Sequence, residues 1–265
     1  MEAVQIKNLS VSYEKTQVIQ GLDLSIPAGK ISIIIGSNGC GKSTLLKTVA
    51  RILKPSAGEI YIGGKEIRTQ KPKNIAKEVA FLPQSPKCPD QITVRELVGY
   101  GRFPYQKAVG GMDQHDKEQV EWAIRQTGLE AIADRLVDCL SGGQRQRAWI
   151  AMTLAQETPT ILLDEPTTYL DMAHQLEVLE LLKKLNREKQ YTIVMVLHEL
   201  NLACRFADHM IGMKDGNVVC EGSPKEAITK ETLKQIYGID AELMESPEGY
   251  PVCVTFERKT NNSPL

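Results

Sequence analysis

The stretch of the sequence with the clearest capacity for chemistry runs from Gly36 to Thr44. Its residues are Gly36, Ser37, Asn38, Gly39, Cys40, Gly41, Lys42, Ser43 and Thr44, which fit the pattern G-x-x-x-x-G-K-[ST] at every fixed position. Glycines let several backbone N–H groups converge on one phosphate, and the start of a helix adds positive potential there. In such a loop Lys42 would contact the β- and γ-phosphates of a nucleotide, and the Ser43 hydroxyl would ligate Mg²⁺.

The neighbouring elements decide between a phosphate site and a glycine-rich turn without a ligand. Lys30 to Ile35 is a largely β-branched run, typical of a strand covered on both faces. Ser43 to Leu53 carries apolar residues at helical spacing and stops before Lys54-Pro55, which predicts a helix. Strand, glycine turn and helix form the context that the motif requires, so we interpret the segment as a nucleotide site.

Two acidic residues follow a second apolar run. Thr160 to Leu163 is predicted to be a buried strand that ends in Asp164-Glu165, at the sheet edge where ligands of parallel sheets bind. Asp164 fits a partner of Mg²⁺, usually through water, and Glu165 fits a group that polarises attacking water. A solvated strand end is the alternative. Another buried strand, Thr192 to Leu197, ends at His198, and a single histidine there is more often structural than catalytic.

Ser141-Gly142-Gly143-Gln144 precedes a predicted helix from Arg145 to Gln156. Ser141 and Gln144 have capping-box spacing, so an ordinary capped helix start is one interpretation. Two adjacent glycines weaken a helix by roughly 1 kcal/mol each, however. Close approach of an anion to bare backbone N–H groups would explain them.

Composition narrows the class of protein. The 265 residues hold 32 Lys and Arg against 33 Asp and Glu, so no basic excess indicates a nucleic-acid partner. No apolar run approaches the ~18–20 residues that span a bilayer. The six cysteines are scattered, which favours reduced thiols of a cytosolic protein over disulfides or a zinc site. Cys40 lies inside the phosphate loop, where helix potential should favour the thiolate, so we expect its alkylation to block activity and ATP to protect.

The phosphate loop combined with a later signature segment, Leu140 to Gln144, resembles the ATP-binding-cassette (ABC) ATPases. The resemblance covers the chain from about Val4 to Ser223. It implies an α/β fold, namely a P-loop NTPase (RecA-like) core with an N-terminal antiparallel β subdomain and an inserted α-helical subdomain. The implied divisions are 1–89 and 157–224 for the two parts of the ATP-binding core, 90–156 for the helical signature subdomain, and 225–265 for a C-terminal helical extension.

The resemblance also implies roles for single residues. Tyr13 matches an aromatic that stacks on the base, although a half-buried strand tyrosine is the plainer interpretation of the sequence alone. Gln84 matches the glutamine at the hinge into the helical subdomain, and Leu170-Asp171 matches the dimer-interface loop. The catalytic residues implied are Glu165, His198, Lys42 and Gln84, with Ser43, Gln84 and Asp164 at the metal. Nucleotide would be bound by Tyr13, the residues from Gly36 to Thr44, and the signature residues Ser141, Gly142, Gly143 and Gln144.

In the family picture two cassettes pair head to tail, and each ATP lies between the phosphate loop of one and the signature of the other. One chain holds one set of motifs, so a homodimer is expected, with ATP and Mg²⁺ as cofactors. ATP-driven dimerisation would power a separate membrane permease, served by an extracytoplasmic substrate-binding protein, with this chain bound peripherally on the cytoplasmic side of the membrane.

Two stretches are similar to a narrower branch of the family. Thr93 to Tyr105 is similar to importers of iron–siderophore complexes, haem and cobalamin, and Leu162 to Leu176 and Leu140 to Gln156 resemble the siderophore branch. Glu199 departs from the aspartate usual after the histidine, a conservative change. Gln84 to Gly111 is expected to hold a groove for a permease helix, with an arbitrary surface loop as the alternative. Import of cobalamin, haem or metal ions remains open, as does a soluble ABC ATPase acting on nucleic acid or ribosomes.

Overall fold

The computed structural model describes residues 1–14, 16–87, 89–106 and 111–258. Some expectations include residues outside this part of the chain. The thiol state of Cys88 is one of them, and the segment from Gln84 to Gly111 includes residues 88 and 107–110. The expected divisions include residues 15 and 88 in 1–89, residues 107–110 in 90–156, and residues 259–265 in the C-terminal extension.

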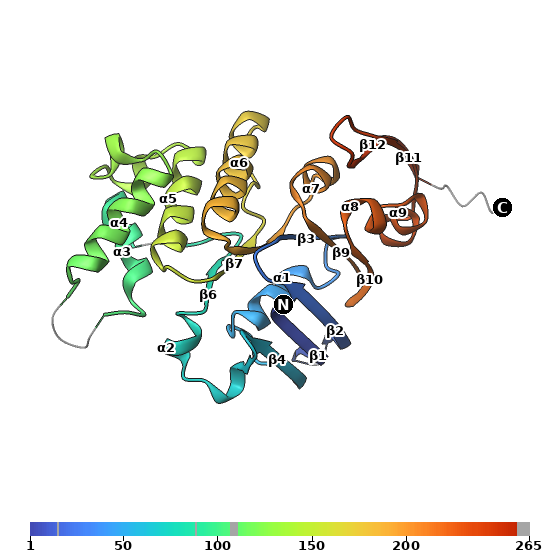
Figure 1. Cartoon of the computed structure of the whole chain (residues 1–265), viewed down its shortest axis with the longest axis horizontal. Helices are drawn as coiled ribbons and strands as arrows, with labels where there is room; N and C mark the ends of the chain where they lie inside the picture. Colours follow the sequence, from blue (N-terminus) through green and yellow to red (C-terminus); the bar gives the residue numbers. More distant parts are fainter. Residues whose placement is uncertain (15, 88, 107–110, 259–265) are drawn as a thin grey trace.

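A six-stranded sheet crosses the molecule in the order β10-β9-β3-β8-β7-β6 (Figure 1). Its strands are β3 (Ile31–Gly36), β6 (Val79–Leu82), β7 (Thr160–Asp164), β8 (Thr192–Val196), β9 (His209–Lys214) and β10 (Asn217–Gly222). All neighbouring pairs are parallel except β9 and β10, which form an antiparallel hairpin at one edge. This is the predicted α/β core.

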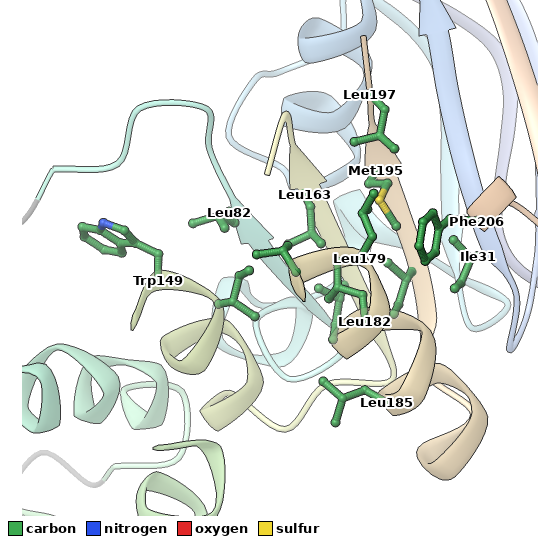
Figure 2. Packing of buried hydrophobic residues seen from close by; sticks show 14 of the residues in the cluster. Ile31, Leu82, Trp149, Leu163, Leu179, Leu182, Leu185, Met195, Leu197 and Phe206 are labelled. Carbon is green, nitrogen blue, oxygen red and sulfur yellow. The ribbon is translucent and has the colours of Figure 1, made fainter. Parts of the chain in front are cut away.

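Side chains along the central strands alternate between two hydrophobic clusters, one on each face of this sheet. Ile33 of β3 belongs to the cluster that includes α6 (Met172–Lys189), whereas Ile34 belongs to the cluster on the opposite face. Figure 2 shows the first cluster, where Leu179 and Leu182 of α6 gather with Leu163 and Met195 of the sheet. Strands buried on both faces need continuous apolar runs, which is why the strands were readable in the sequence.

The second face is covered by α1 (Lys42–Val49) and by an antiparallel sheet in the order β2-β1-β4-β5. The strands are β1 (Glu2–Tyr13), β2 (Thr16–Pro27), β4 (Ala57–Ile62) and β5 (Lys65–Glu66), followed by the short helix α2 (Pro72–Ile75). Figure 1 places this sheet and α1 below the core sheet. The helix expected to reach Leu53 ends at Val49, because Arg51 adopts a left-handed conformation with φ 60° that an α-helix cannot contain.

Between β6 and β7 the chain forms the helical arm, made of α3 (Val94–Gly99), α4 (Gln114–Gln126) and α5 (Gly142–Ala155). The arm projects from one end of the core sheet (Figure 1). Both predicted capping boxes are confirmed, Thr93 with Glu96 on α3 and Ser141 with Gln144 on α5. The glycines after Ser141 are the first turn of α5, so this helix begins earlier than the expected Arg145.

After β8 the chain forms α7 (Leu200–Phe206), the β9–β10 hairpin, α8 (Pro224–Ala227) and α9 (Lys230–Tyr237). The expectation of a helical C-terminal extension is wrong beyond α9, where β11 (Ile239–Glu245) and β12 (Pro251–Arg258) form an antiparallel hairpin. The inward residues of β11 are Ile239, Ala241 and Leu243, of which only Ile239 favours strands strongly. No helix within the described part of the chain is long and apolar enough to cross a membrane.

Candidate functional site

The predicted site residues follow the carboxyl ends of four neighbouring parallel strands. In the sheet order β3-β8-β7-β6, the phosphate loop follows β3 and His198 follows β8. Asp164 ends β7 with Glu165 directly after it, and Gln84 follows β6. Because parallel strands place their carboxyl ends at one edge, segments far apart in the sequence meet there.

The phosphate loop is held open around the Lys42 side chain. The Lys42 ammonium donates hydrogen bonds to the carbonyl oxygens of Gly36 at 2.8 Å and Ser37 at 2.9 Å. A Cβ atom at Gly36 would overlap the Met213 carbonyl oxygen of β9, so only glycine fits where the loop leaves the sheet. A third, longer contact runs to Cys40 Sγ at 3.9 Å. The two carbonyl acceptors are neutral, and an anionic phosphate is a stronger partner for an ammonium group.

Ser43 and Asp164 meet below the loop. The Ser43 hydroxyl donates to Asp164 Oδ1 at 2.8 Å, while the buried Oδ2 of Asp164 has no hydrogen-bond partner. Burial raises the pKa of the Asp164 carboxyl, and the Ser43 hydrogen bond opposes this rise only in part. A hydroxyl beside a carboxylate with an unsatisfied buried oxygen fits Mg²⁺, which is typically held by one or two protein groups plus phosphate oxygens and water. Accordingly, the described residues contain no cluster of three or more His, Cys, Asp or Glu side chains that could hold a metal by themselves.

The Glu165 side chain contacts three other side chains at this edge. Its Oε1 lies 2.6 Å from His198 Nε2, and its Oε2 accepts from Gln84 Nε2 at 2.6 Å. Thr168 also donates to Oε2, at 3.0 Å. Glu165 itself has a positive φ of 55°, an uncommon conformation of the kind that clusters at functional sites.

Thr168 was missed by sequence reasoning. The turn that follows β7 brings it to Glu165, since the Thr168 N–H donates to the Glu165 carbonyl oxygen at 3.3 Å. Gln84 was predicted at the metal as well, but its recorded hydrogen bond goes to Glu165.

These side chains surround an open cleft of about 630 Å³. It is lined by Val18, Asn38, Gly39, Gly41, Lys42, Ser43, Thr44, Gln84, Glu165, Thr168 and His198. Val18, on β2, was not predicted. Tyr13 is not part of the lining; it is 43% exposed at the end of β1, where its hydroxyl accepts from Thr44 Oγ1 at 3.4 Å.

The predicted reactivity of Cys40 is wrong. Its side chain is only 3% exposed and packs in the hydrophobic cluster beneath the loop. Burial raises the pKa of the thiol, and the nearby Lys42 charge only partly offsets this. Helix potential is therefore outweighed by desolvation, and the thiol stays protonated.

The signature segment does not reach the cleft of its own chain. Ser141 to Gln144 lie at the start of α5 in the helical arm, and none of them lines the cleft. Gly142 is exposed and a Cβ there would meet nothing, whereas a Cβ at Gly143 would lie 2.8 Å from the His174 ring. Gly143 therefore has a packing role against α6 that the sequence alone did not reveal.

The expected dimer-interface loop caps α6. Asp171 Oδ1 accepts from the backbone N–H of His174 at 2.9 Å and lies 2.8 Å from its Nδ1. The flanking Tyr169 is 90% exposed, and Met172 is exposed as well.

Comparison with known proteins agrees with this geometry. The pattern described as ABC transporter matches residues 19–168. The chain belongs to the ABC transporter family. Proteins of this class hydrolyse ATP to power transport, so the chain is an ATPase that binds ATP. A resemblance first visible in two short motifs thus extends over more than half of the chain.

Relatives of known name match over the whole length. The "Iron(3+)-hydroxamate import ATP-binding protein FhuC" of Bacillus subtilis (strain 168) is 48% identical over 266 residues, covering 100% of this chain and 99% of the relative. The "Achromobactin transport ATP-binding protein CbrD" of Dickeya dadantii (strain 3937) is also 48% identical, covering 98% and 97%. Among solved structures, the ATP-binding cassette MJ0796, a dimer in a post-hydrolysis state bound to ADP and Pi, is 31% identical with a TM-score of 0.74, covering 83% of this chain and 98% of that one.

Proposed function

We propose that this chain is the ATP-hydrolysing subunit of an importer of iron–siderophore complexes. Relatives at 48% identity are named for import of iron(3+)-hydroxamate and for achromobactin transport, and they match over almost the whole chain. The observation that carries the catalytic part is the Glu165 carboxylate, held by His198 and Gln84 at the mouth of a cleft that also contains Lys42.

The loop residues and Lys42 bind the phosphates of ATP. The Lys42 ammonium exchanges the carbonyl oxygens of Gly36 and Ser37 for β- and γ-phosphate oxygens, while the backbone N–H groups at the start of α1 face the same anion. Tyr13 stacks on the base, and its hydrogen bond with Thr44 at the phosphate loop supports this role. Ser43 and Asp164 hold Mg²⁺, which when bound neutralises charge on the phosphates.

Glu165 polarises a water for in-line attack on the γ-phosphate. For this role its carboxylate must exchange one of its present partners, Gln84, Thr168 or His198, for the water. His198 then turns toward the developing charge on the phosphate. Gln84 transmits the presence of bound nucleotide to the helical arm, which follows it in the chain.

A second copy of the chain completes the site. Ser141, Gly142, Gly143 and Gln144 stand at a helix start, with Ser141 and Gly142 exposed, and none of them lines the cleft of their own chain. In a head-to-tail homodimer this helix start meets the γ-phosphate bound to the partner's loop. The dimeric state of the MJ0796 cassette supports this arrangement.

The surface after Gln84 is suited to a permease. Phe103 is 59% exposed and stacks on Tyr100 with ring centroids 5.1 Å apart, which offers an apolar surface at the base of the arm. Arg102 is fully buried behind it and bonds Asp116 at 2.8 Å and the Ala155 carbonyl at 2.7 Å, so this surface has a rigid support. We place the chain on the cytoplasmic side of the membrane, bound to permease subunits that an extracytoplasmic substrate-binding protein supplies.

The class of cargo, iron–siderophore complexes, is proposed from the names of the relatives alone. Proteins equally similar to this chain are named for different siderophores, because the ATPase does not touch the cargo. Haem, cobalamin or metal-ion import is the alternative within the family, and ATP-dependent uptake of a ferric siderophore by vesicles containing the permease would distinguish them. Action on nucleic acid or ribosomes is not favoured, since the relatives are named for import or transport.

Glu165→Gln tests the catalytic proposal. We expect turnover to fall by roughly 100-fold or more while ATP binding persists, because the amide keeps the shape of the side chain but cannot act as the base. Glu177→Gln, a matched change at an exposed position of α6, should leave both unchanged. Residual hydrolysis above about one tenth of the unsubstituted rate would contradict the role of Glu165.

A further inference from the structure

One side chain of α7 forms hydrogen bonds with the backbone of the C-terminal hairpin. Asn201 Nδ2 donates to the Cys253 carbonyl oxygen at 3.1 Å, and the Cys253 backbone N–H donates to Asn201 Oδ1 at 2.8 Å. The Asn201 amide therefore bonds the outer edge of β12 as a neighbouring strand would. It satisfies the N–H and the carbonyl oxygen of Cys253, which would otherwise lack a partner in the hairpin. Figure 1 shows β12 beside α7.

This contact falls at the weakest part of α7. The helix has only 7 residues, and its N-cap residue Glu199 makes no side-chain capping bond. So short a helix has little stability of its own, and its position depends on packing. Ala203, Cys204 and Phe206 are buried on the inner face, whereas Leu200 and Leu202 of the first turn are only partly buried against the same core. Asn201 adds the hydrogen bonds that tie this first turn to β12.

The first turn of α7 is also the support of His198. Only Glu199 separates the histidine from the helix, while on its other side the Leu197 N–H donates to the Ile34 carbonyl of β3 at 3.3 Å. The backbone of His198 is thus held between β8 and the start of α7. Its ring must keep the 2.6 Å contact with Glu165, and displacements of about 1 Å in such contacts lower turnover strongly.

We infer that Asn201 is a positioning residue: by tying the first turn of α7 to β12, it holds His198 in place for ATP hydrolysis. This inference rests on the proposed function, since it assigns the hairpin a part in the same reaction. Asn201 touches neither the cleft nor Glu165, and acts through the helix that follows His198.

Asn201→Ala is the first test, with Asn74→Ala on the short helix α2 as the matched exposed control. We expect kcat to fall about 5- to 10-fold with the KM for ATP within about twofold, because the phosphate loop is not altered. Asn74→Ala should keep both constants. An unchanged kcat for Asn201→Ala overturns the inference.

The histidine side chains supply a readout that a merely structural role would not move. The chain has 4 histidines, His115, His174, His198 and His209, so their ring signals can be followed together by NMR. Asn201→Ala should shift or broaden the His198 signal alone. Movement of all four signals, or a loss of kcat without movement of His198, contradicts the inference. If the unsubstituted chain hydrolyses no ATP, the proposed function fails, and the NMR result still decides whether Asn201 positions His198.

The same bond can be removed from the other side. Cys253→Pro eliminates the N–H that donates to Asn201, at a strand edge where proline is tolerated, while Cys253→Ala keeps that N–H. The proline variant should reproduce the kcat loss and the His198 shift of Asn201→Ala, and the alanine variant should show neither. Equal behaviour of the two variants overturns the inference.

Discussion

At the residue scale, Asp164 is suited to bind a ligand but lowers the stability of the protein when no ligand is bound. Its carboxyl is almost completely buried, one oxygen lacks a hydrogen-bond partner, and burial raises its pKa. Such a group destabilises the folded chain until a cation or a proton satisfies it. Residues of this kind are typical of sites selected for binding rather than for stability.

We predict that Asp164→Asn stabilises the ligand-free chain by on the order of 1 kcal/mol, because it removes the desolvated charge. The folded carboxyl has the higher pKa, so its contribution is favourable at low pH and is lost as the pH rises through the folded pKa. Thermal unfolding at several pH values measures this. The stabilisation by the substitution should grow as the pH rises through that range, and the substitution should abolish Mg²⁺-dependent ATP hydrolysis. A less stable variant at neutral pH would contradict the prediction.

Cys40 yields a second prediction at the residue scale. Because its thiol is buried and its pKa is raised, we expect iodoacetamide to modify it at least roughly tenfold more slowly than Cys139, which is exposed. Mass spectrometry after timed labelling measures both sites in one sample, so Cys139 is the internal control. Labelling of Cys40 at the rate of Cys139 would show that the loop opens readily and exposes the thiol.

At the scale of elements, the two glycines in the first turn of α5 have different expected roles: Gly143 packs against His174, and Gly142 approaches the partner's nucleotide. Gly142→Ala should raise the melting temperature slightly, since alanine favours a helix by roughly 1 kcal/mol over glycine and its Cβ meets nothing. The same methyl group would stand in the way of the partner's nucleotide, so ATP turnover should fall about tenfold or more. Calorimetry and a turnover assay measure the two effects.

Gly143→Ala is the matched comparison. Its Cβ would lie 2.8 Å from the His174 ring, so this variant should be less stable than the unsubstituted chain. A Gly142→Ala variant with normal turnover would indicate that no anion approaches this helix start.

The elements differ in how well they could be predicted. Strands β3, β7 and β8 are buried on both faces and have continuous apolar runs, so their ends and the residues that follow them were predictable. The capping boxes at Thr93 and Ser141 depend on local spacing and were predictable too. The β11–β12 hairpin, the contact of Gly143 with His174 and the burial of Cys40 depend on tertiary packing, to which a single sequence gives no direct access.

At the scale of the whole molecule, the proposed function makes the cleft and the signature segment parts of one site, although a single chain keeps them apart. The cleft lies at the carboxyl edge of the core sheet, and the start of α5 belongs to the arm beyond β6. Tyr169, just before α6, and Met172, the first residue of α6, are both exposed and add an apolar surface beside the cleft. The arrangement favours a dimer in which each chain supplies what the other lacks.

Mixing two inactive variants tests this directly. Lys42→Ala removes the phosphate-binding ammonium, and Gly142→Asp sets a carboxylate against the γ-phosphate at a helix start that tolerates acidic residues. Each variant alone should be inactive. In a head-to-tail heterodimer one site carries both defects and the other carries neither, so an equal mixture should recover up to about a quarter of the original turnover.

A site contained within one chain predicts no recovery. Coupling between the two sites of a dimer would also suppress recovery, but it has a different signature: an excess of the Lys42→Ala variant would then quench the unsubstituted chain, because it captures intact chains in heterodimers. An independent single-chain site would be unaffected by that excess. Absence of both recovery and quenching would therefore exclude the shared site and leave the exposed Gly142 of α5 without a partner.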